Sequence, residues 1–197
     1  FLTLRAEHLH HGAERASQGL FLSPTPSQRI RIFMNGMPVH LSTGETMIQT
    51  IGVIGAGQMG NGIAQVAACA GYDVVMIDIK DEYVDKGLGT IQFSLGKLVS
   101  KERMTQDDAD AALGRITTGT ERSMCADCDL VVEAVPEILS LKQEIFTELD
   151  NLCKPETILA SNTSSISITT IAASTQRPDK VIGCLLYTSD AADDQAS

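Results

Sequence analysis

The sequence lacks tryptophan, long apolar runs and any excess of positive charge over its 197 residues. No apolar stretch approaches the roughly 20 residues of a transmembrane helix, so we expect no membrane partner. The formal net charge of −10 disfavours nucleic acid and anionic membrane surfaces, because both would repel an acidic protein. With 43% hydrophobic and 20% charged residues, the composition is that of a globular protein, and the length suffices for one domain and part of another.

Cysteines are few, odd in number and scattered: there are five. Disulfide-stabilised domains carry paired cysteines, so we expect free thiols and a reducing compartment, the cytoplasm. Cys125 and Cys128 form a C-x-x-C, a spacing that metal and redox sites also use. Without a second pair or a nearby histidine, these two side chains are better interpreted as buried or half-buried thiols.

Residues 1–46 form a leader whose composition differs from that of the central part of the chain. They contain four arginines and no lysine, whereas residues 47–183 contain four arginines and seven lysines. All four histidines also lie in this leader: His8, His10, His11 and His40. No period of 2 or 3.6 organises it, and Met47 stands where the next strand should begin. We therefore expect translated upstream sequence that is disordered; an arginine-rich transit peptide is the alternative.

The most informative stretch is Ile51–Asp78, where an apolar run precedes glycines in G-x-G-x-x-G spacing, a helix pattern of small residues and a second apolar run. This order predicts strand, tight turn, helix and strand. Gly55 would let the chain turn off the strand, Gly57 would let the backbone approach a pyrophosphate, and Gly60 would let the helix pack close to the sheet. The N–H groups at the start of the helix would then bind the phosphates.

The same stretch predicts which dinucleotide binds. Gln58 and Met59 complete the cofactor-binding turn of the motif. Asp78 lies 23 residues after Gly55, near the spacing of about 20 expected for the carboxylate that hydrogen-bonds the ribose hydroxyls. A carboxylate there would repel a 2′-phosphate, so the motif predicts NAD rather than NADP.

A helical hairpin should follow this unit. Residues 81–99 place apolar side chains at steps of three and four, which predicts an amphipathic helix. Thr105 to Asp108 resemble a capping box that would open a second short helix, ending near Leu113. A packing role and a role as a substrate arm both remain open for this hairpin.

Alternating strands and helices then resume. Strands are predicted at 115–119, 129–135, 157–161 and 180–183, and helices at 138–152 and up to 173. The first of these helices should place Leu141, Ile145, Leu149 and Leu152 on its core face. The alternation predicts an α/β fold with a Rossmann-type, doubly wound parallel sheet and an inserted helical hairpin. Ligands gather at the carboxyl ends of such strands, so Glu137 and residues 162–165 should line one crevice with the glycine turn.

Four segments carry a family resemblance: GAGQMGNGIA, DLVVEAVPE, ETILASNTSSISIT and RPDKVIG. Together they resemble the NAD-binding domain of the 3-hydroxyacyl-CoA dehydrogenases, most closely the bacterial 3-hydroxybutyryl-CoA type, over Met47–Gly183. The resemblance implies hydride transfer between NAD and an acyl-CoA substrate, which interconverts 3-hydroxyacyl-CoA and 3-oxoacyl-CoA in fatty acid or butanoate metabolism.

The resemblance also implies roles for individual residues. Glu137 and Lys142 match positions that contact the nicotinamide half of NAD. Ser164 matches the serine that hydrogen-bonds the substrate oxygen, and Asn162 lies beside it. The alternative for Ser164 is a helix N-cap, although Ser165 could take that role instead.

Two further matches concern coenzyme A, namely Ser94 and Lys101 on and just after the long predicted helix. A lysine suits an anionic ligand, although a solvated surface lysine is the simpler interpretation of Lys101.

The family's general base is missing from its expected position. In the family a histidine follows RPDKVIG within two residues, but Leu185 stands here, and residues 47–183 contain no histidine. Because residues 184–194 can be encoded by a transposon-end adapter, we expect residues 184–197 to be artefactual. The C-terminal helical domain, with its contacts for a homodimer or larger oligomer, would then be absent. Two functions remain open: an inactive fragment of a dehydrogenase, or a stand-alone NAD-binding module without catalysis.

Overall fold

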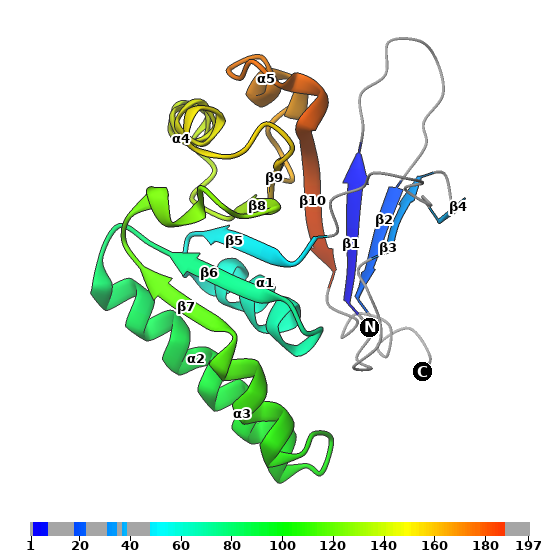
Figure 1. Ribbon diagram of the computed structural model, residues 1–197, viewed down its shortest axis with the longest axis vertical. Helices are drawn as coiled ribbons and strands as arrows, with labels where there is room; N and C mark the ends of the chain where they lie inside the picture. Colours follow the sequence, from blue (N-terminus) through cyan, green and yellow to red (C-terminus); the bar gives the residue numbers. More distant parts are fainter. Residues whose placement is uncertain (1, 8–17, 23–30, 35–36, 39–47, 188–197) are drawn as a thin grey trace.

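A computed structural model describes the backbone of residues 2–7, 18–22, 31–34, 37–38 and 48–187, with side chains over residues 48–184. Six strands form a parallel sheet in the order β10-β9-β8-β5-β6-β7 (Figure 1). They are β5 (Thr50–Ile54), β6 (Asp73–Ile77), β7 (Ile116–Gly119), β8 (Leu130–Glu133), β9 (Ile158–Ser161) and β10 (Val181–Tyr187). β5, the first of these six strands in the chain, lies inside the sheet, and the chain winds outward from it first to β7 and then to β10. This arrangement confirms the predicted doubly wound fold.

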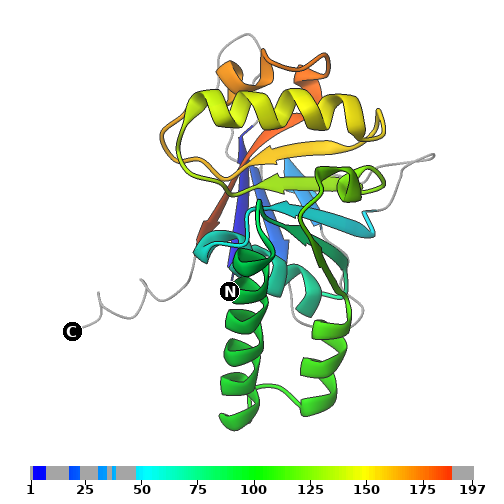
Figure 2. The same cartoon turned by 90° about the vertical axis from the view of Figure 1, so that its left-hand side faces the viewer.

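Helices cover both faces of the sheet (Figures 1 and 2). The first face carries α1 (Gln58–Cys69), α2 (Asp81–Ser100) and α3 (Gln106–Gly114), and the second carries α4 (Leu139–Leu152) and α5 (Ile168–Ala172). The described residues also form two short 3-10 helices, η1 (Arg122–Cys125) and η2 (Pro178–Lys180). Within the described residues, no helix combines the length and apolarity needed to span a membrane.

Each face of the sheet has its own apolar core. Successive strand residues point to opposite faces, so Val132 belongs to the core under α1 and Val131 to the core under α4. Because both faces are covered, the strands are continuous apolar runs rather than alternating ones. The stripe that α4 buries consists of Lys142, Ile145, Phe146 and Leu149. Ile145 and Leu149 therefore confirm the predicted stripe, and the half-buried Leu141 packs against this core. Leu152 is also half-buried, and the burial of Lys142 and Phe146 was not predicted.

The predicted helical hairpin is confirmed by α2 and α3, which project together below the sheet in Figure 2. Thr105 is the N-cap of α3: its Oγ1 accepts a hydrogen bond from the Asp108 backbone N–H at 3.1 Å and donates one to Asp108 Oδ2 at 2.7 Å. The capping pattern in the sequence therefore marks the start of the helix correctly.

The predicted disordered leader differs from the structure in four segments. These are β1 (Leu2–Glu7), β2 (Gln18–Leu22), β3 (Arg31–Met34) and β4 (Met37–Pro38), which extend the sheet beyond β10. β1 runs antiparallel to β10, with Glu7 opposite Gly183 and Thr3 opposite Tyr187. An edge strand presents unpaired N–H and C=O groups, which an extended segment can satisfy whatever its side-chain pattern. Met47, the four histidines and residues 188–197 lie outside the described residues.

Candidate functional site

Three strand ends meet at one edge of the sheet. Ile54, Glu133 and Ser161 are the last residues of β5, β8 and β9, and they lie opposite one another in the strand register. The loops that follow these strands therefore leave the sheet side by side, as the sequence predicts for the glycine turn and residues 162–165. The chain order reverses between β5 and β8, so this is the switch point where doubly wound sheets bind ligands.

The glycine turn contains two glycines required by the fold. Gly55 has φ +104°, and a Cβ there would lie 2.8 Å from the Ala134 carbonyl oxygen. A Cβ on Gly60 would collide with the Gly55 carbonyl oxygen, so α1 could not pack this close to β5 with any larger residue. These observations confirm the close packing that the motif predicts.

Gly57 is different, because a Cβ there would meet no atom within 4 Å. It is the N-cap of α1, and no side chain caps the helix or places an acidic group in its first turn. Gln58 and Met59, the first two residues of α1, are both exposed. The helix therefore presents uncapped N–H groups and the positive end of its dipole to open space, which fits a bound pyrophosphate.

Asp78 follows β6 and lies against the glycine turn. Its Oδ2 accepts a hydrogen bond from the Ala56 backbone N–H at 2.7 Å, and its Oδ1 accepts one from the Ile79 N–H at 2.7 Å. A carboxylate has about four lone-pair sites, so capacity remains for ribose hydroxyls. Asp78 thus holds the turn as well as offering an anionic group beside it, and the first of these roles was not predicted from the sequence.

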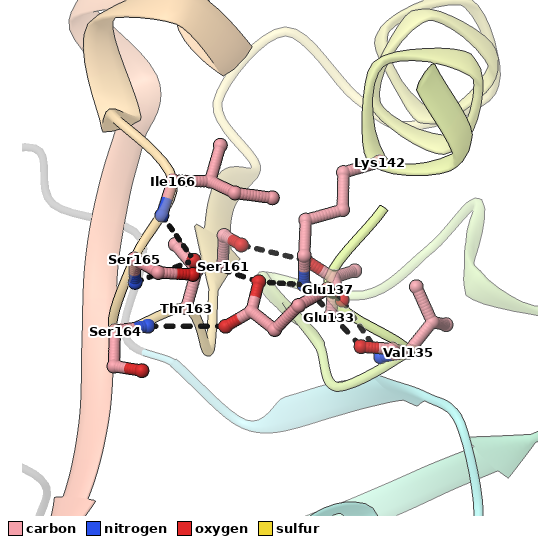
Figure 3. Close-up of polar contacts among 9 residues, drawn as sticks. All are labelled: Glu133, Val135, Glu137, Lys142, Ser161, Thr163, Ser164, Ser165 and Ile166. Atoms are coloured by element: carbon pink, nitrogen blue, oxygen red, sulfur yellow. Dashed lines mark hydrogen bonds and ion pairs between the residues drawn. The ribbon is translucent and has the colours of Figure 1, made fainter. Parts of the chain in front are cut away.

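A buried polar network lies under the second half of the site (Figure 3). Glu133 and Lys142 have no exposed side-chain surface, and Lys142 Nζ lies 2.6 Å from Glu133 Oε1. The second oxygen, Glu133 Oε2, accepts a hydrogen bond from Ser161 Oγ at 2.6 Å. Sequence reasoning missed Glu133 and Ser161; the only local signal was a glutamate within the apolar run of β8. Lys142 is completely buried beneath the site surface, so the contact with the nicotinamide half of NAD that the resemblance implies for it could be made only through a neighbour.

Glu137 is that neighbour, and its side chain is 41% exposed. Glu137 Oε2 lies 3.6 Å from Lys142 Nζ and accepts a hydrogen bond from Thr163 Oγ1 at 2.9 Å. Glu137 Oε1 accepts one from the Ser164 backbone N–H at 3.1 Å (Figure 3). The structure therefore brings the predicted Glu137 and Ser164 together, although their positions are 27 residues apart in the sequence.

Ser164 leaves its hydroxyl free of any hydrogen bond to the residues that the structure describes. Thr163 stabilises the turn instead, because its Oγ1 accepts the Ile166 N–H at 3.0 Å. The N-cap of α5 is Ser167, which also makes no side-chain capping bond. The helix-capping alternative for Ser164 is therefore not observed. Asn162 is half-buried, and its backbone N–H donates to the Glu133 carbonyl oxygen at 2.8 Å.

The two predicted coenzyme A residues lie on the hairpin. Ser94 is half-buried in α2, and Lys101 is exposed at the C-cap of that helix. They are seven residues apart, close to two helical turns, which places them on one side of α2. No hydrogen bond or ion pair of their side chains joins them to Glu137 or Ser164 in the described structure.

Four of the five cysteines are buried, and Cys69 is half-buried. Cys125 and Cys128 lie in the core under α4, which confirms the prediction of buried thiols. A hydrogen bond between the two raises the pKa of Cys125 and lowers the pKa of Cys128. Burial raises the pKa of Cys184 to about 12 and that of Cys153 to about 11. Among the described residues, no group of three or more His, Cys, Asp or Glu side chains could hold a metal ion.

Comparison with known proteins points to one family. The family model for the 3-hydroxyacyl-CoA dehydrogenase NAD-binding domain matches residues 50–186. A probable 3-hydroxybutyryl-CoA dehydrogenase of Deinococcus radiodurans is 54% identical over 132 residues, which are 67% of this chain and 47% of the relative. A 3-hydroxybutyryl-CoA dehydrogenase of Bradyrhizobium diazoefficiens is 50% identical over 137 residues, which are 70% of this chain and 47% of that relative.

Solved structures agree with the sequence comparison. The crystal structure of (S)-3-hydroxybutyryl-CoA dehydrogenase from Ralstonia eutropha is 48% identical, with a TM-score of 0.66 over 69% of this chain and 48% of that one. The chain spans about half the length of the curated relatives it matches. The glycine turn, the uncapped start of α1 and Asp78 fit the NAD that this family binds. This chain therefore belongs to the 3-hydroxyacyl-CoA dehydrogenase family, and residues 50–186 are its NAD-binding domain.

Proposed function

We propose that the protein is part of an oxidoreductase that interconverts 3-hydroxyacyl-CoA and 3-oxoacyl-CoA, with 3-hydroxybutyryl-CoA as the preferred substrate. The observation that carries this proposal is the free hydroxyl of Ser164, which a hydrogen-bonded turn holds at the switch point of the sheet. Support also comes from relatives with 3-hydroxybutyryl-CoA dehydrogenase in their names.

The cofactor half of the proposal uses the first unit of the fold. The N–H groups of Gln58 and Met59 would bind the pyrophosphate, and Asp78 would bind the ribose hydroxyls and exclude a 2′-phosphate. Ile79 is 73% exposed beside Asp78 and would offer an apolar surface to the adenine. When bound, NAD supplies the hydride acceptor.

The substrate half uses the second unit. The Ser164 hydroxyl would donate a hydrogen bond to the 3-oxygen of the substrate, and Asn162 would add a polar group beside it. Glu137, supported by Lys142, would lie against the nicotinamide half of the cofactor. Ser94 and Lys101 would bind coenzyme A, with the lysine ammonium facing an anionic group of that ligand. These roles require that α2 and the Ser164 turn face one bound molecule.

Oxidation of the 3-hydroxyl also releases a proton, and a positioned base must accept it. Residues 47–183 contain no histidine, and Leu185 occupies the position that matches the family's base. We propose that this 197-residue chain binds NAD without turnover, and that the longer protein is a homodimer or larger oligomer. The competing proposal is an NAD-binding module without catalysis, for which the free Ser164 hydroxyl would have no use.

NADH oxidation with acetoacetyl-CoA, followed at 340 nm, tests this function. The chain as given should show no robust turnover. Loss of a general base alone costs about 10²- to 10⁴-fold in rate, and loss of the groups that position the acyl-CoA should lower the rate further. Replacing residues 184–197 with the C-terminal half of a family member should give an active fusion, and Ser164→Ala in that fusion should lower kcat. An inactive fusion that still binds NAD would favour the module, and turnover by the unmodified chain would contradict the proposed lack of a base.

A further inference from the structure

We infer that Glu133 and Ser161 are positioning residues that keep Glu137 in place under the Ser164 turn, by holding the ammonium of Lys142. This inference rests on the proposed role of Ser164. The residues involved form one chain of contacts, here called the Glu133 network: Ser161, Glu133, Lys142, Glu137 and Thr163, in that order (Figure 3).

Two contacts of the network join the end of β9 to the end of β8 and the segment that follows it. Ser161 is the last residue of β9 and Thr163 lies two residues later, and each binds a glutamate at or just after the end of β8. Ser161 binds Glu133 and Thr163 binds Glu137, while Lys142 lies between the two carboxylates. The contacts therefore close a ring, so the Ser164 turn is fixed relative to the connection that carries Glu137.

The ammonium of Lys142 lies closer to Glu133 than to Glu137. Its Nζ lies 2.6 Å from Glu133 Oε1 but 3.6 Å from Glu137 Oε2. A buried ammonium needs a close anionic partner, because it has lost its water. Glu133 supplies that partner, and Glu137 therefore keeps both oxygens for Thr163 and Ser164.

Removing the Glu133 carboxylate would leave Lys142 without its close anionic partner. Glu137 would then be the remaining carboxylate beside Lys142 among the described residues, and the buried ammonium would draw it inward. The hydrogen bonds from Thr163 Oγ1 and the Ser164 N–H would lengthen or break. Ser161 contributes by orienting Glu133, whose Oε2 accepts the Ser161 hydroxyl while Oε1 also accepts the Val135 N–H at 2.7 Å.

The direct test is the backbone amide signal of Ser164 in an NMR spectrum of the ¹⁵N-labelled 197-residue chain. An N–H donated to a carboxylate has a distinctive proton shift, so loss of the bond to Glu137 should move it. Glu133→Gln should shift this signal, and the double variant Glu133→Gln with Lys142→Met should return it toward its original position, because no buried ammonium then pulls on Glu137. A Ser164 signal that is unchanged in Glu133→Gln, or that stays displaced in the double variant, would overturn the inference.

A second pair of variants keeps the test valid if Glu133→Gln does not fold. Ser161→Ala removes one hydroxyl that donates to Glu133. Thr157→Val removes a buried hydroxyl just before the same strand, where it donates to the Cys128 carbonyl oxygen at 2.7 Å. Ser161→Ala should shift the Ser164 signal and Thr157→Val should not. Equal shifts in both variants would show that the network acts only as packing.

Ligand affinity gives an independent readout. NADH carries a nicotinamide and ADP-ribose does not, so the ratio of their Kd values reports on the half of the site near Glu137. Glu133→Gln should raise the Kd for NADH roughly tenfold while leaving ADP-ribose unchanged; an equal effect on both ligands would contradict the inference.

The outcomes separate this inference from the proposed function. If Glu133→Gln moves the Ser164 signal but Ser164→Ala leaves the turnover of the active fusion unchanged, the positioning network is real and the substrate role of Ser164 is wrong. If Ser164→Ala lowers kcat while Glu133→Gln moves neither the signal nor the ratio, the proposed function stands and the inference fails.

Discussion

Gly87 of α2 packs directly on Ala56 of the glycine turn: a Cβ at Gly87 would lie 2.7 Å from the Ala56 carbonyl oxygen and 2.9 Å from the Ala56 Cβ. The long helix of the hairpin therefore contacts the cofactor turn through a position that tolerates no side chain. A displacement of α2 at this point would move the backbone of the glycine turn, which is expected to bind the pyrophosphate.

Gly87→Ala should therefore destabilise the fold and weaken NAD binding together. Overpacking a close contact costs about 1 to 3 kcal/mol, and we expect the Kd for NAD to rise roughly tenfold. Gly89→Ala is the matched control, because a Cβ at this exposed position meets nothing within 4 Å. It should stabilise the helix by about 0.5 to 1 kcal/mol. Thermal unfolding and titration calorimetry measure both effects, and similar behaviour of the two variants would contradict the packing argument.

Cofactor choice should depend on Asp78. The unmodified chain should bind NAD more tightly than NADP, and Asp78→Ala should narrow the difference by weakening NAD binding about tenfold, which is the range of a hydrogen bond to a charged group. Glu156→Ala removes an exposed carboxylate from the turn before β9, at the opposite edge of the sheet, and should leave the preference intact. Equal affinities of the unmodified chain for the two cofactors, measured by calorimetry, would show that Asp78 does not select NAD.

Arg177 should be a stability residue with no role in binding. Its Nε donates to Asp150 Oδ1 at 2.6 Å, and its guanidinium also donates to the carbonyl oxygens of Asp150, Cys153 and Lys154 at the end of α4. A lysine cannot reproduce this fork of donors. Arg177→Lys should lower the free energy of unfolding by about 2 kcal/mol and leave the Kd for NAD unchanged.

The control for Arg177 is the same substitution at a more exposed ion pair. Arg122 pairs with Glu148, whose side chain is 44% exposed. Surface pairs contribute less than about 1 kcal/mol, so Arg122→Lys should have a small effect. Denaturant titrations of the two variants compare them directly; equal losses of stability would mean that the carbonyl contacts of Arg177 contribute little.

Stability should fall at alkaline pH partly because of Cys153. Burial raises the pKa of its thiol from 9.0 to about 11. Above pH 9 the unfolded chain loses this proton while the folded protein keeps it, so unfolding becomes more favourable as pH rises from 9.0 to about 11. The full effect approaches about 3 kcal/mol. Cys153→Ala should show a shallower loss of stability over this range, and parallel curves for the two proteins would exclude the thiol as a cause.

Periodicity and turn chemistry predicted the parallel sheet, the hairpin and the glycine turn, because each depends on residues close together in the sequence. The Glu133 network could not be predicted in this way. Glu133 and Lys142 interrupt apolar patterns in the sequence. Their contact with each other, and that of Glu133 with Ser161, forms only when β8, β9 and α4 pack together. Thr163 was missed for a similar reason, since four neighbouring polar residues could each have stabilised the turn. Strands β1 to β4 were missed because no clean period of 2 marks them in the sequence. Only β1 pairs with the open edge of β10, and β2, β3 and β4 each pair with the strand before them.

The three glycines of the cofactor turn differ in what would happen if they were replaced. Side chains at Gly55 and Gly60 would collide with the backbone, so these two positions are fixed by the architecture even in a protein that had lost its ligand. Gly57 has φ −64° and ψ −171°, a conformation open to most residues, and its surroundings are empty. A homologue with a bulky residue at position 57 alone would keep this fold but could not bind the dinucleotide. The residue at position 57 therefore tells which proteins of this fold can still bind the cofactor.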